Sequence, residues 1–196
     1  ALPFLLPLLM QVGFGLSPFQ SGLVTFSSAV GAMGMKTLAA RIIRTFGFRN
    51  MMTVNALIST IFLAACALFT VHTPLLLIMI ILVVGGFFRS LEFTAINTVA
   101  YAEVEAAQMS RATTLVSVNQ QLAISAGVAV GAFCVESTMF WRHATELDAT
   151  MFAPAFLVVS VISAASAWFF WQMPSDAGHE ISGRKAIDIS SEKGSA

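Results

Sequence analysis

Charged residues are scarce in this sequence. Only 10% of its 196 residues are Asp, Glu, Lys or Arg, whereas a soluble globular domain carries about 25%. Seven of these charges follow Pro174, which leaves few for the rest of the chain. Hydrophobic residues make up 57% of the sequence. This composition indicates a protein whose solvent is lipid, and the net charge of zero gives no indication of a nucleic-acid partner.

Cysteine clusters and catalytic motifs are also missing. The two cysteines, Cys66 and Cys134, lie inside apolar runs, which excludes a disulfide framework and a Cys-x-x-Cys metal site. We interpret both as small buried hydrophobes. The histidines fall in predicted loops or in the C-terminal tail, and no glycine-rich phosphate loop occurs. We therefore expect no enzyme, no metal and no cofactor.

Six long apolar segments dominate the chain. Lipid requires every backbone group to be bonded internally, which leaves helices or barrel strands. The residues of these segments run continuously without polar alternation, which rules out strands. The first segment is shorter than the about 20 residues that span a bilayer, so we expect a helix truncated at its start. The sequence thus predicts an all-α, polytopic membrane protein, with a six-helix bundle in residues 1–173 and a flexible tail in residues 174–196. The predicted segments are 2–16, 21–35, 51–70, 75–99, 112–138 and 152–173.

Basic residues gather on one side of this predicted topology. The connection 36–50, after the second segment, is expected to be a basic loop, and the connection after the fourth segment ends in Arg111. The opposite side carries only Arg142. Since Lys and Arg accumulate on the cytoplasmic side, we expect a multi-pass protein of the inner (plasma) membrane with a cytoplasmic C-terminus. The basic residues of the expected loop are Lys36, Arg41, Arg44 and Arg49, the last three flanking Gly47.

Two ionisable residues lie inside the fourth segment. Arg89 and Glu92 occur in an otherwise apolar run, where each costs roughly 2.5–3.5 kcal/mol on insertion scales and usually faces a cavity or a partner. Their i, i+3 spacing places them on neighbouring helix positions, where they can pair. Two interpretations stay open: a substrate or ion pathway, or an Arg89 that snorkels to the headgroups with Glu92 as its counter-ion.

Amides and small residues occupy the neighbouring segments. Helix rise places several amides near the depth of Arg89, so we expect a polar layer that lines the pathway or joins helices by hydrogen bonds. Gly127 and Gly131 form a GxxxG pattern, which is typical of close helix packing. The amides in this predicted layer are Asn55, Asn97, Gln120 and Gln121.

Three stretches resemble the major facilitator superfamily, specifically its multidrug:proton antiporters with fourteen predicted spans. They are 5–17, the basic stretch 40–49, and 88–98 with the following Ser110–Thr113 and Gln120–Leu122. Ala40 stands where the family's loop motif usually has Asp. The resemblance implies the C-terminal half of a transporter, with a site at the bilayer midplane between two halves.

The resemblance further implies partners and a function. The expected partners are the lipid bilayer, a small-molecule substrate, protons and an N-terminal transporter half. The leading hypothesis is proton-coupled efflux of small organic, amphipathic compounds by alternating access. The alternatives are a specific metabolite transporter of the same fold, or a transport-inactive membrane module that acts by protein contact.

Overall fold

The computed structural model describes residues 1–102 and 104–172, and every regular element within these ranges is helical. The expected all-α class is confirmed. The predicted tail, 174–196, lies outside the described residues. The elements are α1 (Leu2–Leu8), its π-helical continuation η1 (Leu9–Gly13), α2 (Pro18–Phe46), α3 (Phe48–Cys66), α4 (Leu75–Ala102), η2 (Ala106–Gln108), α5 (Met109–Trp141), η3 (Ala149–Met151) and α6 (Ala153–Trp171).

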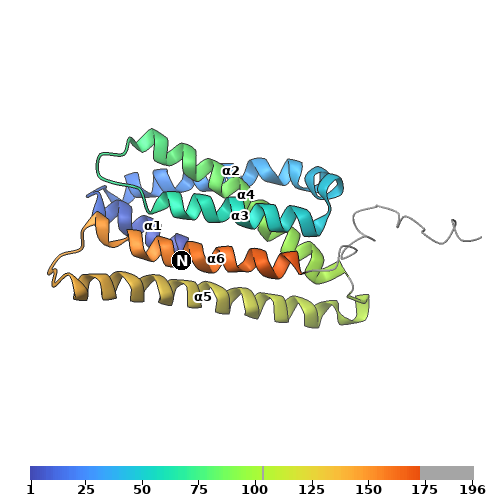
Figure 1. The fold of residues 1–196 in the computed structure, drawn as a ribbon. Helices are drawn as coiled ribbons and strands as arrows, with labels where there is room; N and C mark the ends of the chain where they lie inside the picture. The colour runs from blue at the N-terminus through green and yellow to red at the C-terminus, as the bar shows by residue number, and fades with distance from the viewer. Residues whose placement is uncertain (103, 173–196) are drawn as a thin grey trace, which may run out of the picture.

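The helices run along a common direction, so their connections gather at two ends (Figure 1). The α2–α3 turn and the start of α5 lie at one end, while the other three connections lie at the opposite end. We call the first the basic end, because Arg41, Arg49 and Arg111 belong to it by their positions along α2, α3 and α5. This grouping matches the two sides that the Lys/Arg distribution predicts.

Four helices within the described residues are long and apolar enough to cross a membrane. α1 with η1 is apolar but short, and α2 is long enough, with 29 residues, but contains many Ser, Thr and Gly residues. Two of its serines, Ser21 and Ser27, are buried inside the bundle. Some of the polar side chains of α2 therefore face the interior of the bundle. The four spans are Phe48–Cys66, Leu75–Tyr101, Met109–Trp141 and Ala149–Trp171.

The basic loop expected at 36–50 is wrong as a loop. α2 continues to Phe46 and α3 begins at Phe48, so Gly47 alone connects them. Gly47 adopts φ 75° and ψ 160°, a region that is essentially restricted to glycine. Basic residues indicate on which side of a membrane a segment lies, but Lys and Arg are also good helix formers. Lys36, Arg41, Arg44 and Arg49 consequently lie on helices that extend beyond the apolar segments.

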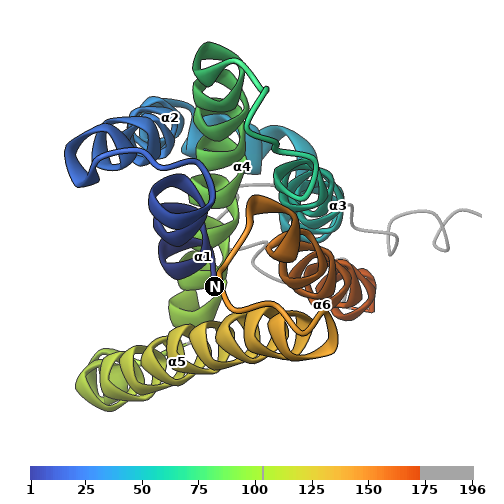
Figure 2. The same cartoon turned by 90° about the vertical axis from the view of Figure 1, so that its left-hand side faces the viewer.

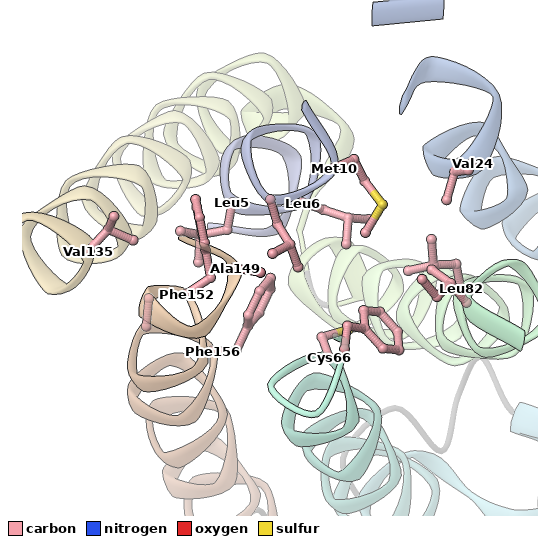
Figure 3. Close-up of a cluster of buried hydrophobic side chains, with 14 residues drawn as sticks. Leu5, Leu6, Met10, Val24, Cys66, Leu82, Val135, Ala149, Phe152 and Phe156 are labelled. Atoms are coloured by element: carbon pink, nitrogen blue, oxygen red, sulfur yellow. The ribbon is translucent and has the colours of Figure 1, made fainter. Parts of the chain in front are cut away.

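One hydrophobic core fills the half of the bundle away from the basic end. Figure 3 shows Leu5 and Leu6 of α1 and Met10 of η1 surrounded by buried side chains of the other helices. Figure 2, a view from this end, shows α1 between α2 and α5 and in front of α4. The labelled neighbours are Val24 from α2, Cys66 from α3, Leu82 from α4, Val135 from α5, Ala149 from η3, Phe152 between η3 and α6, and Phe156 from α6.

A second core lies toward the basic end and is built without α1. It joins α2, α3 and α4 through buried apolar side chains, with Phe170 of α6 packed against it. The start of α3 contributes to the second core and its end, at Cys66, contributes to the first. Asn55 and Ser59 lie between these two parts of the helix. The residues of the second core are Met35, Ala39, Ile43, Phe48, Met51, Met52, Leu91 and Ala95.

Glycines set the closest helix crossing. α2 packs more extensively against α4 than against any other element. A Cβ at Gly31 of α2 would overlap the carbonyl oxygen of Val83, and one at Gly86 of α4 would overlap that of Ser28. Only glycine permits this backbone approach. The sequence analysis did not single out these two glycines, because they form no GxxxG pair within one helix.

Candidate functional site

A cavity of about 170 Å³ is lined by residues of α1, α2, α3, α4 and α6, and it borders the first core at Cys66 and Leu82. We call it the polar cavity. Its polar side chains come from four helices: Ser28 from α2, Ser59 from α3, Arg89 and Glu92 from α4, and Ser163 from α6. Apolar residues and glycines complete the walls. The structure thus places Arg89 and Glu92, which the sequence singled out, along one internal space.

Glu92 is held from the neighbouring helix by an amide. Asn55 Nδ2 donates to Glu92 Oε2 at 3.4 Å and to the Phe88 carbonyl oxygen at 2.9 Å. The side chain of Asn55 is 2% exposed. Because the Phe88 carbonyl only accepts hydrogen bonds, these contacts assign the nitrogen of the amide to this side. Asn55 therefore fixes the carboxylate of Glu92 to α3 and leaves its own Oδ1 facing elsewhere.

The contact between Arg89 and Glu92 that their helix spacing allows is not formed in the structure. Among the residues that the structure describes, no ion pair or hydrogen bond joins the two, although both line the polar cavity. Arg89 also lines an adjoining recess of about 420 Å³ between α1 and α2. The helix spacing makes a pair possible but does not require it, because a long side chain at i and a shorter one at i+3 can take different directions.

The predicted amide layer divides into separate contacts. Gln120 Nε2 donates to Asn97 Oδ1 at 3.1 Å and thereby links α5 to α4. Asn97 Nδ2 donates to the Phe93 carbonyl of its own helix at 2.7 Å. Gln121 is exposed and does not line the polar cavity. The structure thus brings Asn55 to Glu92, while Asn97 and Gln120 join two helices and Gln121 stays apart.

The GxxxG glycines of α5 pack against the first helix. A Cβ at Gly131 would lie 3.2 Å from Leu5 Cδ1, and one at Gly127 would lie 2.8 Å from the nitrogen of Ala1. Glycine at both positions therefore permits the contact between α5 and α1. The α2–α4 crossing uses Gly31 and Gly86 in a similar way.

The sequence analysis did not identify the three cavity serines. Ser59 is 8% exposed, and its Oγ has no hydrogen-bond partner among the described residues. It lies four residues after Asn55, so the two share a face of α3. This helical spacing of two polar residues in an apolar helix is the signal that could have indicated Ser59. Ser28 and Ser163 carry no comparable signal, because serine is common in membrane helices.

The comparisons with known proteins agree with this architecture. A family model described as the Major Facilitator Superfamily matches residues 1–193. The chain belongs to the Major Facilitator Superfamily. Within this superfamily, the chain is similar to proteins called "Putative multidrug resistance protein MdtD". That of Serratia proteamaculans (strain 568) is 31% identical over 179 residues, which cover 89% of this chain and 37% of the relative. That of Yersinia pestis (strain Pestoides F) is 28% identical, over 90% of this chain and 38% of the relative.

The chain therefore spans less than two fifths of the length of these superfamily relatives. No solved structure matches it. In this chain α2 packs against α4, and α5 packs against α1.

Proposed function

We propose that this chain is one six-helix half of a proton-coupled exporter of small amphipathic organic compounds. The name that its relatives carry, multidrug resistance protein, supports export of such compounds. In this proposal the chain works against an N-terminal half in the inner membrane, with its C-terminus in the cytoplasm. Alternating access would result from rocking of the two halves around a site at the midplane. The proposed transporter performs no chemical conversion.

The observation that carries the proposal is the environment of Glu92. Its carboxyl group lies in a cavity inside an apolar bundle and receives its hydrogen bond from the neutral amide of Asn55. A carboxylate held by a fixed cation would strongly favour the charged form. A carboxylate beside a neutral amide and serine hydroxyls can exist in both protonation states, because each neighbour tolerates either. Such a group suits the reversible carriage of a proton.

Arg89 supplies the complementary half of the site. It lines both the polar cavity and the recess beside α1 and α2. Its positive charge would repel a cationic substrate from the cavity while Glu92 is protonated. Ionised Glu92 would offset this charge without direct contact. A cationic substrate would then enter the cavity only when Glu92 has released its proton. This mutual exclusion of substrate and proton is the requirement for exchange.

The test is a flux assay on the full-length protein that contains this chain. The protein is reconstituted into vesicles with pyranine inside, a pH gradient is imposed, and the movement of the cationic dye ethidium is followed together with internal pH. We expect dye and protons to move in opposite directions. Glu92→Gln should abolish proton movement, while Glu136→Gln, at an exposed position of α5, should leave it unchanged.

Two results would contradict the proposal. Dye flux without proton movement would exclude proton coupling, and absence of any flux in correctly inserted protein would favour an interaction module. Loss of proton movement in both glutamine variants would show that Glu92 has no special role.

A further inference from the structure

One hydroxyl group in the wall of the polar cavity is buried without a bond. Ser59 of α3 is 8% exposed, and its Oγ neither donates nor accepts a hydrogen bond among the described residues. Many other hydroxyls of the bundle bond to a carbonyl oxygen of their own helix, as the neighbouring Thr60 does to Ala56 at 2.8 Å. The hydroxyl of Ser59 is therefore available to a group that lies in or beside the cavity.

Ser59 lies beside the Glu92 carboxyl on the neighbouring helix. It follows Asn55 by one turn on the same face of α3, and Asn55 Nδ2 donates to Glu92 Oε2. The Ser59 hydroxyl is close to the same carboxyl, although the two are not in hydrogen-bond geometry. A small change in the side-chain torsion of Ser59 would join them, because both line an open cavity.

A protonated Glu92 needs a hydrogen-bond acceptor that its present partner cannot supply. Protonation by the aqueous side forms an O–H bond on the carboxylate, and such a donor is costly if it stays unpaired inside an apolar bundle. Asn55 Nδ2 only donates, and its second bond, to the Phe88 carbonyl oxygen at 2.9 Å, keeps it on this side. Arg89, which lines the same cavity, also has donors only.

Hydroxyl oxygens are the acceptors among the polar side chains of the cavity wall. Ser28 and Ser163 line the cavity from α2 and α6, whereas Ser59 is the serine close to the Glu92 carboxyl. Cys66, another titratable group in the wall, lies about two turns further along α3 in the first core, and its sulfur is a weak acceptor. Ser59 is therefore the best placed acceptor for a proton-loaded carboxyl group.

We propose that Ser59 is the positioning residue that accepts the hydrogen bond of protonated Glu92. In the ionised state the carboxylate accepts from Asn55 Nδ2, and the Ser59 hydroxyl can donate to it. In the protonated state the Glu92 hydroxyl donates to Ser59 Oγ, whose own hydrogen turns toward the cavity. A hydroxyl can reverse its role in this way because it both donates and accepts. The inference rests on the proposed protonation of Glu92 and adds the residue that holds the proton-loaded form.

Infrared difference spectroscopy of the full-length protein in lipid tests this bond without requiring transport. Spectra recorded at low and high pH differ by the carbonyl bands of protonated carboxyl groups, and the band that Glu92→Gln removes belongs to Glu92. Loss of a hydrogen bond moves the carbonyl band of a carboxylic acid to higher wavenumber. We expect this shift in Ser59→Ala, and we expect Ser59→Thr, which keeps a hydroxyl, to leave the band in place.

Matched variants keep the test decisive. Ser160→Ala removes a hydroxyl that is 4% exposed but bonds to the Leu157 carbonyl of its own helix, so it should not move the Glu92 band. Ser59→Cys keeps the size of the side chain with a weaker acceptor, and it should move the band in the same direction if Ser59→Ala does not fold. A Glu92 band that neither Ser59 variant moves, or that Ser163→Ala moves instead, would overturn the proposal.

The spectra and the flux assay separate this role of Ser59 from the proposed export. A shifted band in a protein that moves no protons across the vesicle membrane would support the role of Ser59 and contradict proton-coupled export. An unmoved band in a protein that exchanges dye for protons would do the reverse. Absence of any Glu92 band from the difference spectrum would overturn both.

Discussion

At the scale of single residues, the polar cavity depends on which groups are in contact. Arg89 and Glu92 are three residues apart on α4, yet Glu92 is bonded to Asn55 of α3. Glu92 thus contacts Asn55 on the neighbouring helix and does not contact Arg89 on its own helix. This difference separates two models of the site that the sequence alone cannot distinguish, and it leads to a thermodynamic test.

We predict that Glu92 is coupled more strongly to Asn55, its hydrogen-bond partner, than to Arg89, which lines the same cavity. The cycle Asn55→Leu, Glu92→Leu and the double variant should give a coupling free energy of about 0.6–1.7 kcal/mol, the range for hydrogen bonds between membrane helices. The cycle through Arg89→Leu should give a smaller coupling, because the two charges share the polar cavity without direct contact. Unfolding by SDS titration in mixed micelles measures both. A larger coupling for Arg89 than for Asn55 would restore the ion-pair model.

Gly47 provides a second residue-scale prediction. Its φ of 75° and ψ of 160° are unfavourable for any residue with a Cβ, at a cost of about 1–3 kcal/mol. Gly47→Ala should lower the free energy of unfolding by this amount. Thr45→Ala, two residues earlier at an exposed position whose hydroxyl bonds to its own helix, serves as the control. An alanine at 47 that is as stable as the unmodified chain would mean that the turn differs from the one described.

At the scale of helices, the bundle is organised by close crossings. α2 and α4 approach each other through Gly31 and Gly86, and α5 approaches α1 through Gly127 and Gly131. The first crossing brings Ser28, Arg89 and Glu92 to the same cavity. The small residues of α2 therefore position the site, although none of them is charged.

We predict that Gly31→Ala disrupts the bundle while Gly34→Ala does not. A Cβ at Gly31 would collide with the backbone of Val83, whereas one at Gly34 would meet no atom within 4 Å. Both substitutions add the same methyl group to the same helix and change helix propensity equally. The melting temperature in detergent, followed by size-exclusion chromatography, should fall clearly for position 31 only. Equal behaviour of the two variants would contradict the described α2–α4 crossing.

At the scale of the whole molecule, the two ends of the bundle correspond to two sides of a membrane. The structure groups the connections as the Lys/Arg distribution predicts (Figure 1), and positive residues favour the cytoplasm for the basic end. Superfamily membership is consistent with this multi-pass arrangement. Which end faces the cytoplasm is a prediction that labelling can test.

We predict that Thr45 and Thr145 are accessible from opposite sides. Both are exposed, one near the α2–α3 turn and the other in the connection after α5. Single cysteines at these positions, in a background without Cys66 and Cys134, should react with a membrane-impermeant maleimide in different preparations. Thr145→Cys should react in intact cells, and Thr45→Cys only after the membrane is opened. Reaction of both in intact cells would exclude the topology.

The sequence by itself determined the class of this protein. Long apolar segments without polar alternation indicate helices in lipid, because only helices and closed barrels bond every backbone group there and the strands of a barrel alternate in polarity. Basic residues predicted the sides of the membrane, and ionisable residues in an apolar run marked Arg89 and Glu92 as members of an internal site. These conclusions follow from composition and local order, which need no knowledge of helix contacts.

Only the tertiary structure decided which residues meet. That Asn55 bonds to Glu92, that Ser59 faces the same cavity, and that Gln121 does not, all depend on the rotation of α3, α4 and α5 about their axes. The continuous helix through Arg41 and Arg44 and the single-residue turn at Gly47 likewise depended on conformation. Lipid-exposed and buried faces are both apolar in a membrane protein, so hydrophobic periodicity, which orients helices in soluble proteins, carries little information about rotation here.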